Sequence, residues 1–239
     1  MSRSWSFHLI AVLSLAFAGC RTSGGSGGRG TGDSGYRDVV AKCVRLMAFD
    51  LDSARDTYPE LAGWRSPPAG TRRIDHATKA GAISVTVSRP AEKKAGHEFP
   101  NLDLAVFVEL SGGRKFVRAA GKIVASRLVP LRDLDAAVGR SLKGFVSDLA
   151  AVKGKYPELS GFSAGAVRGG RLYYVSGGFS VTVWADLAPE RAAEVRCFPL
   201  CARVAGGSRA ARGTVLSLLE KNLEPLRELQ RRTGGWRVR

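Results

Sequence analysis

Hydrophobic residues recur at steps of three and four along two stretches of the chain, one ending at Tyr58 and one at Tyr156. The first comprises Tyr36, Val40, Val44, Met47, Leu51, Ala54 and Tyr58, and the second Leu134, Val138, Leu142, Phe145, Leu149, Val152 and Tyr156. This spacing is typical of one face of an amphipathic helix. A proline follows each tyrosine, and because the residue before proline disfavours helical angles, we expect each helix to end there.

Alternation of apolar and polar residues predicts strands after each of these helices. The segments with this pattern are 71–75, 83–88 and 102–110 in the first half and 171–175, 179–184 and 195–204 in the second. A Ser-Gly-Gly connection between the first two segments of the second half favours a tight hairpin. A last helical stripe runs from 213 to 232, where Pro225 should kink or split the helix.

The two halves also share short motifs at a nearly constant separation. Tyr58-Pro59-Glu60-Leu61 recurs 98 residues later as Tyr156-Pro157-Glu158-Leu159. The segments 83–87 and 130–134 recur 96 and 95 residues later, at 179–183 and 225–229. The sequence therefore predicts an α+β fold made by tandem duplication of an α-β-β-β-α unit, with antiparallel sheets covered by amphipathic helices. Residues 36–133 would form the first repeat and residues 134–239 the second.

The N-terminal segment has the features of an export signal. Residues 1–19 contain a single positive charge and a short apolar run, too short for a membrane span. Ala18-Gly19-Cys20 resembles the lipobox of bacterial lipoproteins, which implies that Cys20 carries the acyl chains, palmitate among them. The alternative is an ordinary signal peptide that happens to contain a cysteine. Residues 20–35 are almost wholly Gly, Ser, Thr and charged residues, the composition of a flexible tether.

Arg21 follows the cysteine of this motif. In the lipoproteins that the motif resembles, an aspartate at this position retains the protein in the inner membrane. The resemblance therefore implies a cell-envelope protein that is lipid-anchored in the outer membrane and faces the periplasm.

The composition adds a strong basic excess. The 239 residues include 37 Lys and Arg against 21 Asp and Glu, a formal net charge of +16. The excess is shared by both halves and is not gathered into a tail. Export makes nucleic acid an unsuitable partner, and we expect anionic neighbours of the envelope, such as lipid head groups, lipopolysaccharide or acidic polymers.

Three cysteines follow Cys20. Cys197 and Cys201 are separated by three residues that include Pro199, and a bend there would allow the disulfide that an oxidising compartment favours. Cys43 would then remain as a buried thiol. The alternatives are a pairing of Cys43 with one of the other two, or separate buried thiols.

No catalytic, cofactor-binding or metal-binding motif is recognisable in the sequence. His76 and His97 stand apart without ligand spacing, and the acidic residues near Asp50 are interpreted as the solvated face of a helix. Glu60 and Glu158 of the repeated motif are candidate twin ligand carboxylates. We prefer to interpret the motif as a helix-terminating signal, in which these glutamates are solvated or cap a turn.

These observations favour a non-enzymatic protein with a binding or scaffolding role in an envelope assembly. Its expected partners are the membrane, through the lipid anchor, and an envelope protein or an anionic envelope polymer. The alternative is a carrier of a small or lipidic ligand held between the repeats, for which the aromatic residues Trp64, Tyr173, Tyr174 and Trp184 are the candidate contacts. A hydrolase with an unfamiliar site ranks below both.

Overall fold

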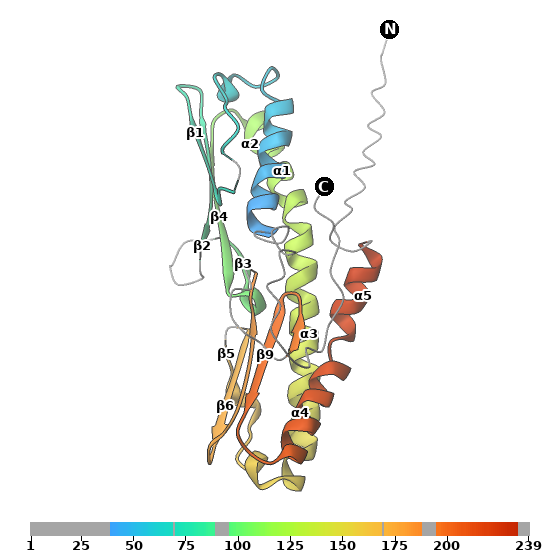
Figure 1. The fold of residues 1–239 in the computed structure, drawn as a ribbon. Helices are drawn as coiled ribbons and strands as arrows, with labels where there is room; N and C mark the ends of the chain where they lie inside the picture. The colour runs from blue at the N-terminus through green and yellow to red at the C-terminus, as the bar shows by residue number, and fades with distance from the viewer. Residues whose placement is uncertain (1–38, 69, 89–95, 169, 188–194, 234–239) are drawn as a thin grey trace.

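The computed structural model describes residues 39–68, 70–88, 96–168, 170–187 and 195–233, which form an elongated molecule (Figure 1). Two α+β units lie end to end along it. The expected signal peptide, Cys20 and the tether lie outside the described residues. The mixture of helices with two antiparallel sheets confirms the expected α+β class.

The first unit contains a four-stranded antiparallel sheet with the order β1-β2-β4-β3. Its helices and strands are α1 (Val39–Ser53), β1 (Arg73–Ala77), β2 (Ala82–Ser88), β3 (His97–Phe99), β4 (Leu104–Ser111) and α2 (Arg114–Arg127). Two 3-10 turns complete it, η2 (Pro59–Leu61) and η3 (Pro100–Leu102).

The second unit follows the same order of elements and adds a short edge strand, so that its sheet reads β5-β6-β7-β9-β8. Its strands and helices are α3 (Val129–Val152), β5 (Val167–Arg168), β6 (Arg171–Ser176), β7 (Phe179–Ala185), β8 (Val195–Cys197), β9 (Leu200–Ala205), α4 (Arg209–Lys221) and α5 (Glu224–Arg232). Its 3-10 turns are η4 (Lys153–Lys155), η5 (Pro157–Leu159) and η6 (Ala164–Ala166).

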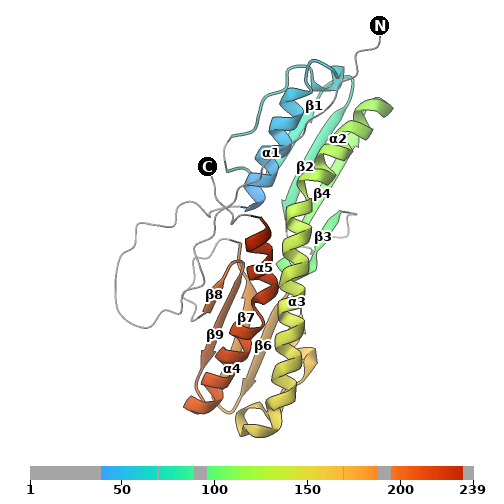
Figure 2. The ribbon, with the colours of Figure 1, turned by 90° about the vertical axis from the view of Figure 1, so that its right-hand side faces the viewer.

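Both sheets lie on the same side of the layer of helices (Figures 1 and 2). The inward side chains of the strands and the apolar stripes of the helices form one continuous core that runs through both units. Successive side chains of a strand point to opposite faces of the sheet. In β2, Ile83 and Val85 point to the core and are buried, whereas Ser84 and Thr86 point outward and are half-buried. The other side of each sheet is not covered by any described helix.

Helix α3 belongs to both units. In its first half Asp135 accepts hydrogen bonds from the backbone N–H groups of Asn101 and Leu102 in η3, at 2.8 and 3.2 Å. In its second half Asp148 accepts a hydrogen bond from Asn222 Nδ2 at the end of α4, at 2.9 Å. Since the expected repeat boundary after residue 133 falls inside this helix, no loop separates the units there.

Three details differ from the expectation. Helices α1 and α3 end at residues 53 and 152, several residues before the tyrosines, because the intervening residues include Asp56, Thr57 and Gly154, which favour turns. The expected strand over 195–204 is a hairpin of β8 and β9, and a short β3 precedes β4.

The expected split at Pro225 is confirmed, since α4 ends at Lys221 and Pro225 lies in the first turn of α5.

Candidate interaction surface

Glu60 caps a helix that lies far from it in the sequence. Its side chain is only 5% exposed, and Oε1 accepts a hydrogen bond from the backbone N–H of Gly113, the N-cap residue of α2, at 2.7 Å. The two glycines at this turn make room, because a Cβ atom on Gly112 or Gly113 would approach the Glu60 side chain within 2.8 or 2.9 Å. A carboxylate at a helix N-terminus also meets the positive end of the helix dipole.

Glu158 makes the corresponding contact in the second unit. Its Oε1 accepts a hydrogen bond from the backbone N–H of Ser208, the N-cap residue of α4, at 2.8 Å. This backbone N–H holds the pKa of the Glu158 carboxyl below its usual value. The two glutamates therefore act as helix caps, which supports the structural interpretation of the repeated motif over the ligand-binding one.

An aromatic pair lies beside each of these caps. Trp64 packs edge-on against His76 with ring centroids 5.2 Å apart, and Phe162 packs edge-on against Tyr174 at 5.4 Å. Each second ring also reaches the backbone carbonyl of the capping glutamate. His76 Nε2 lies 3.1 Å from Glu60 O, and the Tyr174 hydroxyl donates to Glu158 O at 2.7 Å.

Two of the four candidate aromatic contacts are buried in these pairs, and the other two are accessible. Trp64 and Tyr174 are 6% and 8% exposed, so these two candidate contacts are buried in the core and do not face a ligand or partner. Tyr173 is 66% exposed and Trp184 is half-buried. The structure therefore leaves Tyr173 and Trp184 as accessible candidates.

Tyr173 and Trp184 share the outward side of the second sheet, which we call the second face. Tyr173 pairs with Thr182, which pairs with Arg203, so one row of outward residues crosses β6, β7 and β9. Trp184 stands two residues beyond Thr182 and is thus a diagonal neighbour of Tyr173 and Arg203, a distance that long side chains can bridge. The described side chains of the second face are Arg171, Tyr173, Val175, Ser180, Thr182, Trp184, Cys201, Arg203 and Ala205.

The outward side of the first sheet, the first face, has a different character. Its described side chains are Arg73, Asp75, Ala77, Ala82, Ser84, Thr86, Ser88, Glu98, Ala105, Phe107, Glu109 and Ser111. Asp75 forms an ion pair with Arg73 and accepts a hydrogen bond from Ser84 Oγ at 2.9 Å. The first face is therefore polar with an acidic excess, whereas the second face has arginines and exposed apolar groups.

The cysteines correct the disulfide expectation. Cys43, Cys197 and Cys201 are all buried as thiols. In the β8–β9 hairpin Cys197 pairs with Leu200, whereas Cys201 pairs with Arg196. Since paired residues share a face and neighbours along a strand alternate, Cys197 and Cys201 belong to opposite sides of the hairpin. Cys197 Sγ instead accepts a hydrogen bond from Gln230 Nε2 of α5, at 3.8 Å.

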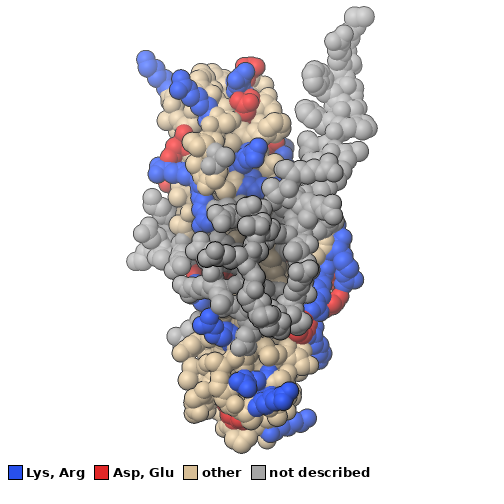
Figure 3. Space-filling view, viewed as in Figure 1, with Lys and Arg blue, Asp and Glu red and all other residues tan. Residues whose placement is uncertain are grey.

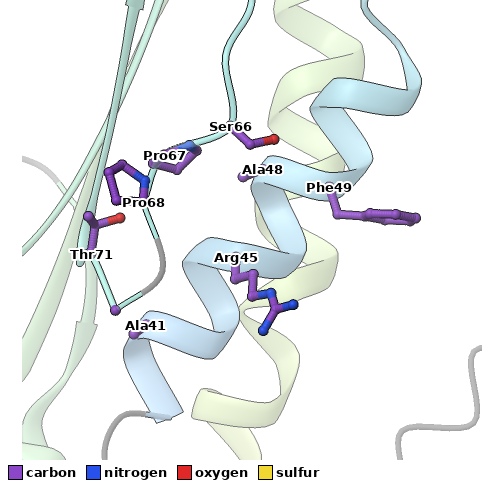
Figure 4. A pocket seen from close by; sticks show the side chains of 9 residues that line it. Ala41, Arg45, Ala48, Phe49, Ser66, Pro67, Pro68 and Thr71 are labelled. Atoms are coloured by element: carbon purple, nitrogen blue, oxygen red, sulfur yellow. The ribbon is translucent and has the colours of Figure 1, made fainter. Parts of the chain in front are cut away.

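A small pocket lies within the first unit, between α1 and residues 66–68, 70 and 71, and has a volume of about 280 Å³ (Figure 4). Ala41 and Ala48 of α1 leave the space that Pro67 and Pro68 line on the other side. Phe49 also borders it but points away from the loop and is 66% exposed. This pocket does not lie between the units, where the ligand-carrier alternative expected one.

Asp50 has a structural partner that the sequence did not reveal. Arg127 of α2 donates from Nε and a terminal nitrogen to the two carboxylate oxygens of Asp50, at 2.6 and 2.7 Å. This hydrogen bond raises the pKa of the Arg127 guanidinium further. The pair is mostly buried, so the interpretation of Asp50 as part of a solvated helix face is wrong.

Basic side chains extend over the whole length of the described surface in the view of Figure 3, with fewer acidic ones among them. Within the described residues, no group of three or more His, Cys, Asp or Glu side chains is arranged to hold a metal ion. None of the helices in this part of the chain is long and apolar enough to cross a membrane. Comparisons with protein-family models, with curated proteins and with solved structures found no match to the chain.

Proposed function

We propose that this chain is a lipid-anchored protein of the bacterial cell envelope, held in the outer membrane facing the periplasm, with a non-catalytic binding or scaffolding role in an envelope assembly. The observation that carries the binding role is the second face, a sheet surface that no described helix covers, on which Tyr173 and Val175 are 66% and 52% exposed and Trp184 and Arg203 lie on the same side. Tyr, Trp and Arg are the residues enriched at the energetic centres of protein interfaces. The lipidated cysteine and the tether rest on the sequence.

The buried or partly buried carboxylates support this proposal, because their described contacts stabilise the fold. The carboxylates of Glu60 and Glu158 bind helix N-termini, and those of Asp135 and Asp148 join α3 to the two units. Each of these groups is used where it stabilises the fold. Two of the large exposed apolar side chains, Tyr173 and Val175, lie instead on the second face.

We infer further that the two units are copies of one ancestral unit. Asp50 binds Arg127 in the first unit, and Asp148, 98 residues after Asp50, binds Asn222, 95 residues after Arg127. The glutamate caps and the aromatic pairs recur at the same separations. By this alignment Tyr173 occupies the position of Asp75, so the inner contacts are kept while the outward side chains differ.

Labelled palmitate tests the anchor. We expect cells to incorporate the label into this protein and to lose it in Cys20→Ala, whereas Cys43→Ala, which removes a buried cysteine, keeps it. Incorporation that persists in Cys20→Ala would contradict a lipid anchor at this residue.

A photo-reactive amino acid placed at Tyr173 tests the binding role in intact cells. We expect a defined cross-linked product from position 173 and none from Lys143, an exposed control position on the helix side of the molecule. The absence of any product from position 173 would refute the second face as a binding surface.

A carrier of a small ligand remains the second candidate function, with its site in the pocket beside Pro67 and Pro68 and not between the repeats, where it was expected. Its volume of about 280 Å³ is near the lower limit of small-molecule sites. Native mass spectrometry of protein purified from its own envelope should then reveal a bound molecule. Replacing Ala48 by Trp to fill the pocket should remove that molecule.

A further inference from the structure

Four basic side chains gather on the outward side of α2. The buried residues of this helix recur every four positions, at Phe116, Ala120 and Val124. With about 3.6 residues per turn, the opposite side of the helix points away from the core. The charged side chains there, all of them exposed, are those of Arg114, Lys115, Arg118 and Lys122. We call these four residues the basic face.

The charge of the basic face is not balanced by the described acidic groups around it. None of its four side chains takes part in a described hydrogen bond or ion pair, and α2 contains no acidic residue. In α1, which packs against α2, Asp50 is already paired with Arg127. Asp52 of the same helix is paired with Arg55.

The basic face does not stabilise the helix that carries it. Arg114 and Arg118 are four residues apart, as are Arg118 and Lys122, and like charges at this spacing repel. Arg114 and Lys115 also lie in the first turn, where the helix dipole favours acidic residues. An anionic surface against the basic face would relieve both effects.

The corresponding helix of the second unit, α4, lacks this concentration of charge. The N-cap residues Gly113 and Ser208 relate α2 to α4 by a separation of 95 residues. The residues of α4 at the positions of the basic face are then Arg209, Ala210, Gly213 and Ser217. Three of the four cations are absent there, so the basic face is a feature of α2 and not of the repeated unit.

The basic face lies in the unit that is nearer the expected anchor along the chain. Val39, the first residue of α1, follows Cys20 by 19 positions. Since an extended chain spans at most about 3.5 Å per residue, Val39 cannot lie more than about 65 Å from Cys20. An acyl anchor at Cys20 therefore keeps α1, and α2 beside it, within reach of the bilayer surface.

We propose that the basic face docks on the anionic lipid head groups of the membrane that holds the anchor. This proposal goes beyond the proposed function by assigning a second surface, and it rests on that function for the lipid anchor. Head-group phosphates complement the four cations, each of which strengthens binding to an anionic bilayer by about fivefold. Because the sheets lie on the other side of the helix layer (Figures 1 and 2), this docking leaves the second face directed away from the membrane.

Co-sedimentation with lipid vesicles tests the docking without the acyl anchor. We expect the full-length Cys20→Ala chain to bind vesicles of equal parts phosphatidylglycerol and phosphatidylcholine more tightly than vesicles of phosphatidylcholine alone. This preference should decrease as salt rises, because the charges are screened. The apolar residues near the N-terminus contribute to binding of both vesicles, so the ratio of the two affinities isolates the effect of charge.

Paired substitutions separate the basic face from the net charge of the chain. Arg118→Gln/Lys122→Gln removes two cations from the basic face and keeps good helix formers, so it should lower the preference by about tenfold or more. Lys153→Gln/Lys155→Gln is the matched control, because it removes the same charge from exposed positions in η4, beyond the far end of α3. We expect the control to keep the preference, while circular dichroism shows both variants to be folded.

A polarity-sensitive dye reports which side of the molecule meets the lipid. In the Cys20→Ala chain the remaining cysteines are buried, so a dye attaches to one introduced cysteine. Ser126→Cys places it beside the basic face at an exposed position, and Tyr173→Cys places it on the second face. We expect vesicles that contain phosphatidylglycerol to shift the emission to the blue at position 126 and to leave it unchanged at position 173.

Three results would overturn the proposal: equal binding to both kinds of vesicle, equal losses in the two paired variants, and a blue shift at position 173 instead of 126. Binding to soluble alginate without binding to vesicles would assign the basic face to an acidic polymer and overturn it as well. The proposed function fails separately. A wild-type chain that incorporates no palmitate, while its Cys20→Ala variant prefers the anionic vesicles, would refute the anchor and keep the contact with head groups.

Discussion

Glu60→Ala tests whether the repeated glutamate stabilises the fold through the helix that it caps. The substitution removes the carboxylate that accepts a hydrogen bond from the Gly113 N–H at 2.7 Å. Because Glu60 is only 5% exposed, its removal leaves this N–H donor without its partner at a buried site. A hydrogen bond to a charged group contributes about 1.5–3 kcal/mol, and the interaction with the helix dipole about 0.3–1 kcal/mol. These contributions overlap, so we expect a loss of about 2–3 kcal/mol in the free energy of unfolding.

Urea unfolding followed by circular dichroism measures this loss. For a folded part of this size 1 kcal/mol corresponds to roughly 2–4 °C, so the melting temperature should fall by about 4–12 °C. Hydrogen exchange should also become faster at Gly113 and in the first turn of α2. Glu158→Ala is the matched control, and because Glu158 is more exposed than Glu60, we expect a smaller loss there. Unchanged exchange at Gly113, or equal losses in the two variants, would refute the reasoning.

Three further predictions concern the second unit and the cysteines. The Glu158 carboxyl has a lowered pKa in the folded state, so its contribution to stability is present above the unfolded pKa of about 4.5 and disappears as the pH falls through the folded pKa. The difference in urea midpoint between wild type and Glu158→Gln should therefore shrink from pH 6 to pH 3. A difference that stays constant would contradict this cause. Gly144→Ala places a Cβ atom 2.2 Å from Asn222 Oδ1 and should destabilise the protein by about 1–3 kcal/mol, while Gly154→Ala, with nothing within 4 Å, should not. All three described cysteines should resist a thiol reagent in the folded protein and react without any reductant once it is unfolded, whereas a disulfide would hide two of them.

The pattern of the sequence predicted the elements whose determinants are local. The stripe through Val44, Met47 and Leu51 is buried in α1, and the Gly177-Gly178 turn joins β6 to β7 with Ser176 opposite Phe179. Both depend on residues within a few positions of each other, so periodicity and turn chemistry are sufficient to find them.

Contacts between distant residues were beyond that reasoning. The partner of Glu60 is 53 residues away at Gly113, and that of Asp50 is 77 residues away at Arg127. A charged residue in a helix or turn looks the same in sequence whether it faces solvent or another helix. The two adjacent glycines before α2 were the available signal for the cap, since they permit the close approach of a side chain to the helix N-terminus.

The sequence identified Tyr173 and Trp184 of the second face but not the rest of the two outward faces, because these depend on which side of each strand faces the core. Tyr173 and Tyr174 are neighbours in one strand, so alternation places one outward and one inward, but the sequence does not say which. The aromatic partner Phe162 decides it by holding Tyr174 in the core. The acidic character of the first face required the register of its strands, which brings Glu98 and Glu109 to the same side.

The continuous helix α3 has a consequence for the order in which the protein is made. Asp135 and the buried Leu134 and Val138 complete the first unit, yet they follow residue 133 along the chain. When residues up to 133 have just left the ribosome, the η3 turn still lacks the Asp135 carboxylate that receives its N–H groups. The first half therefore stays incomplete until the start of the second is available, a delay that would suit the export that we propose for this chain.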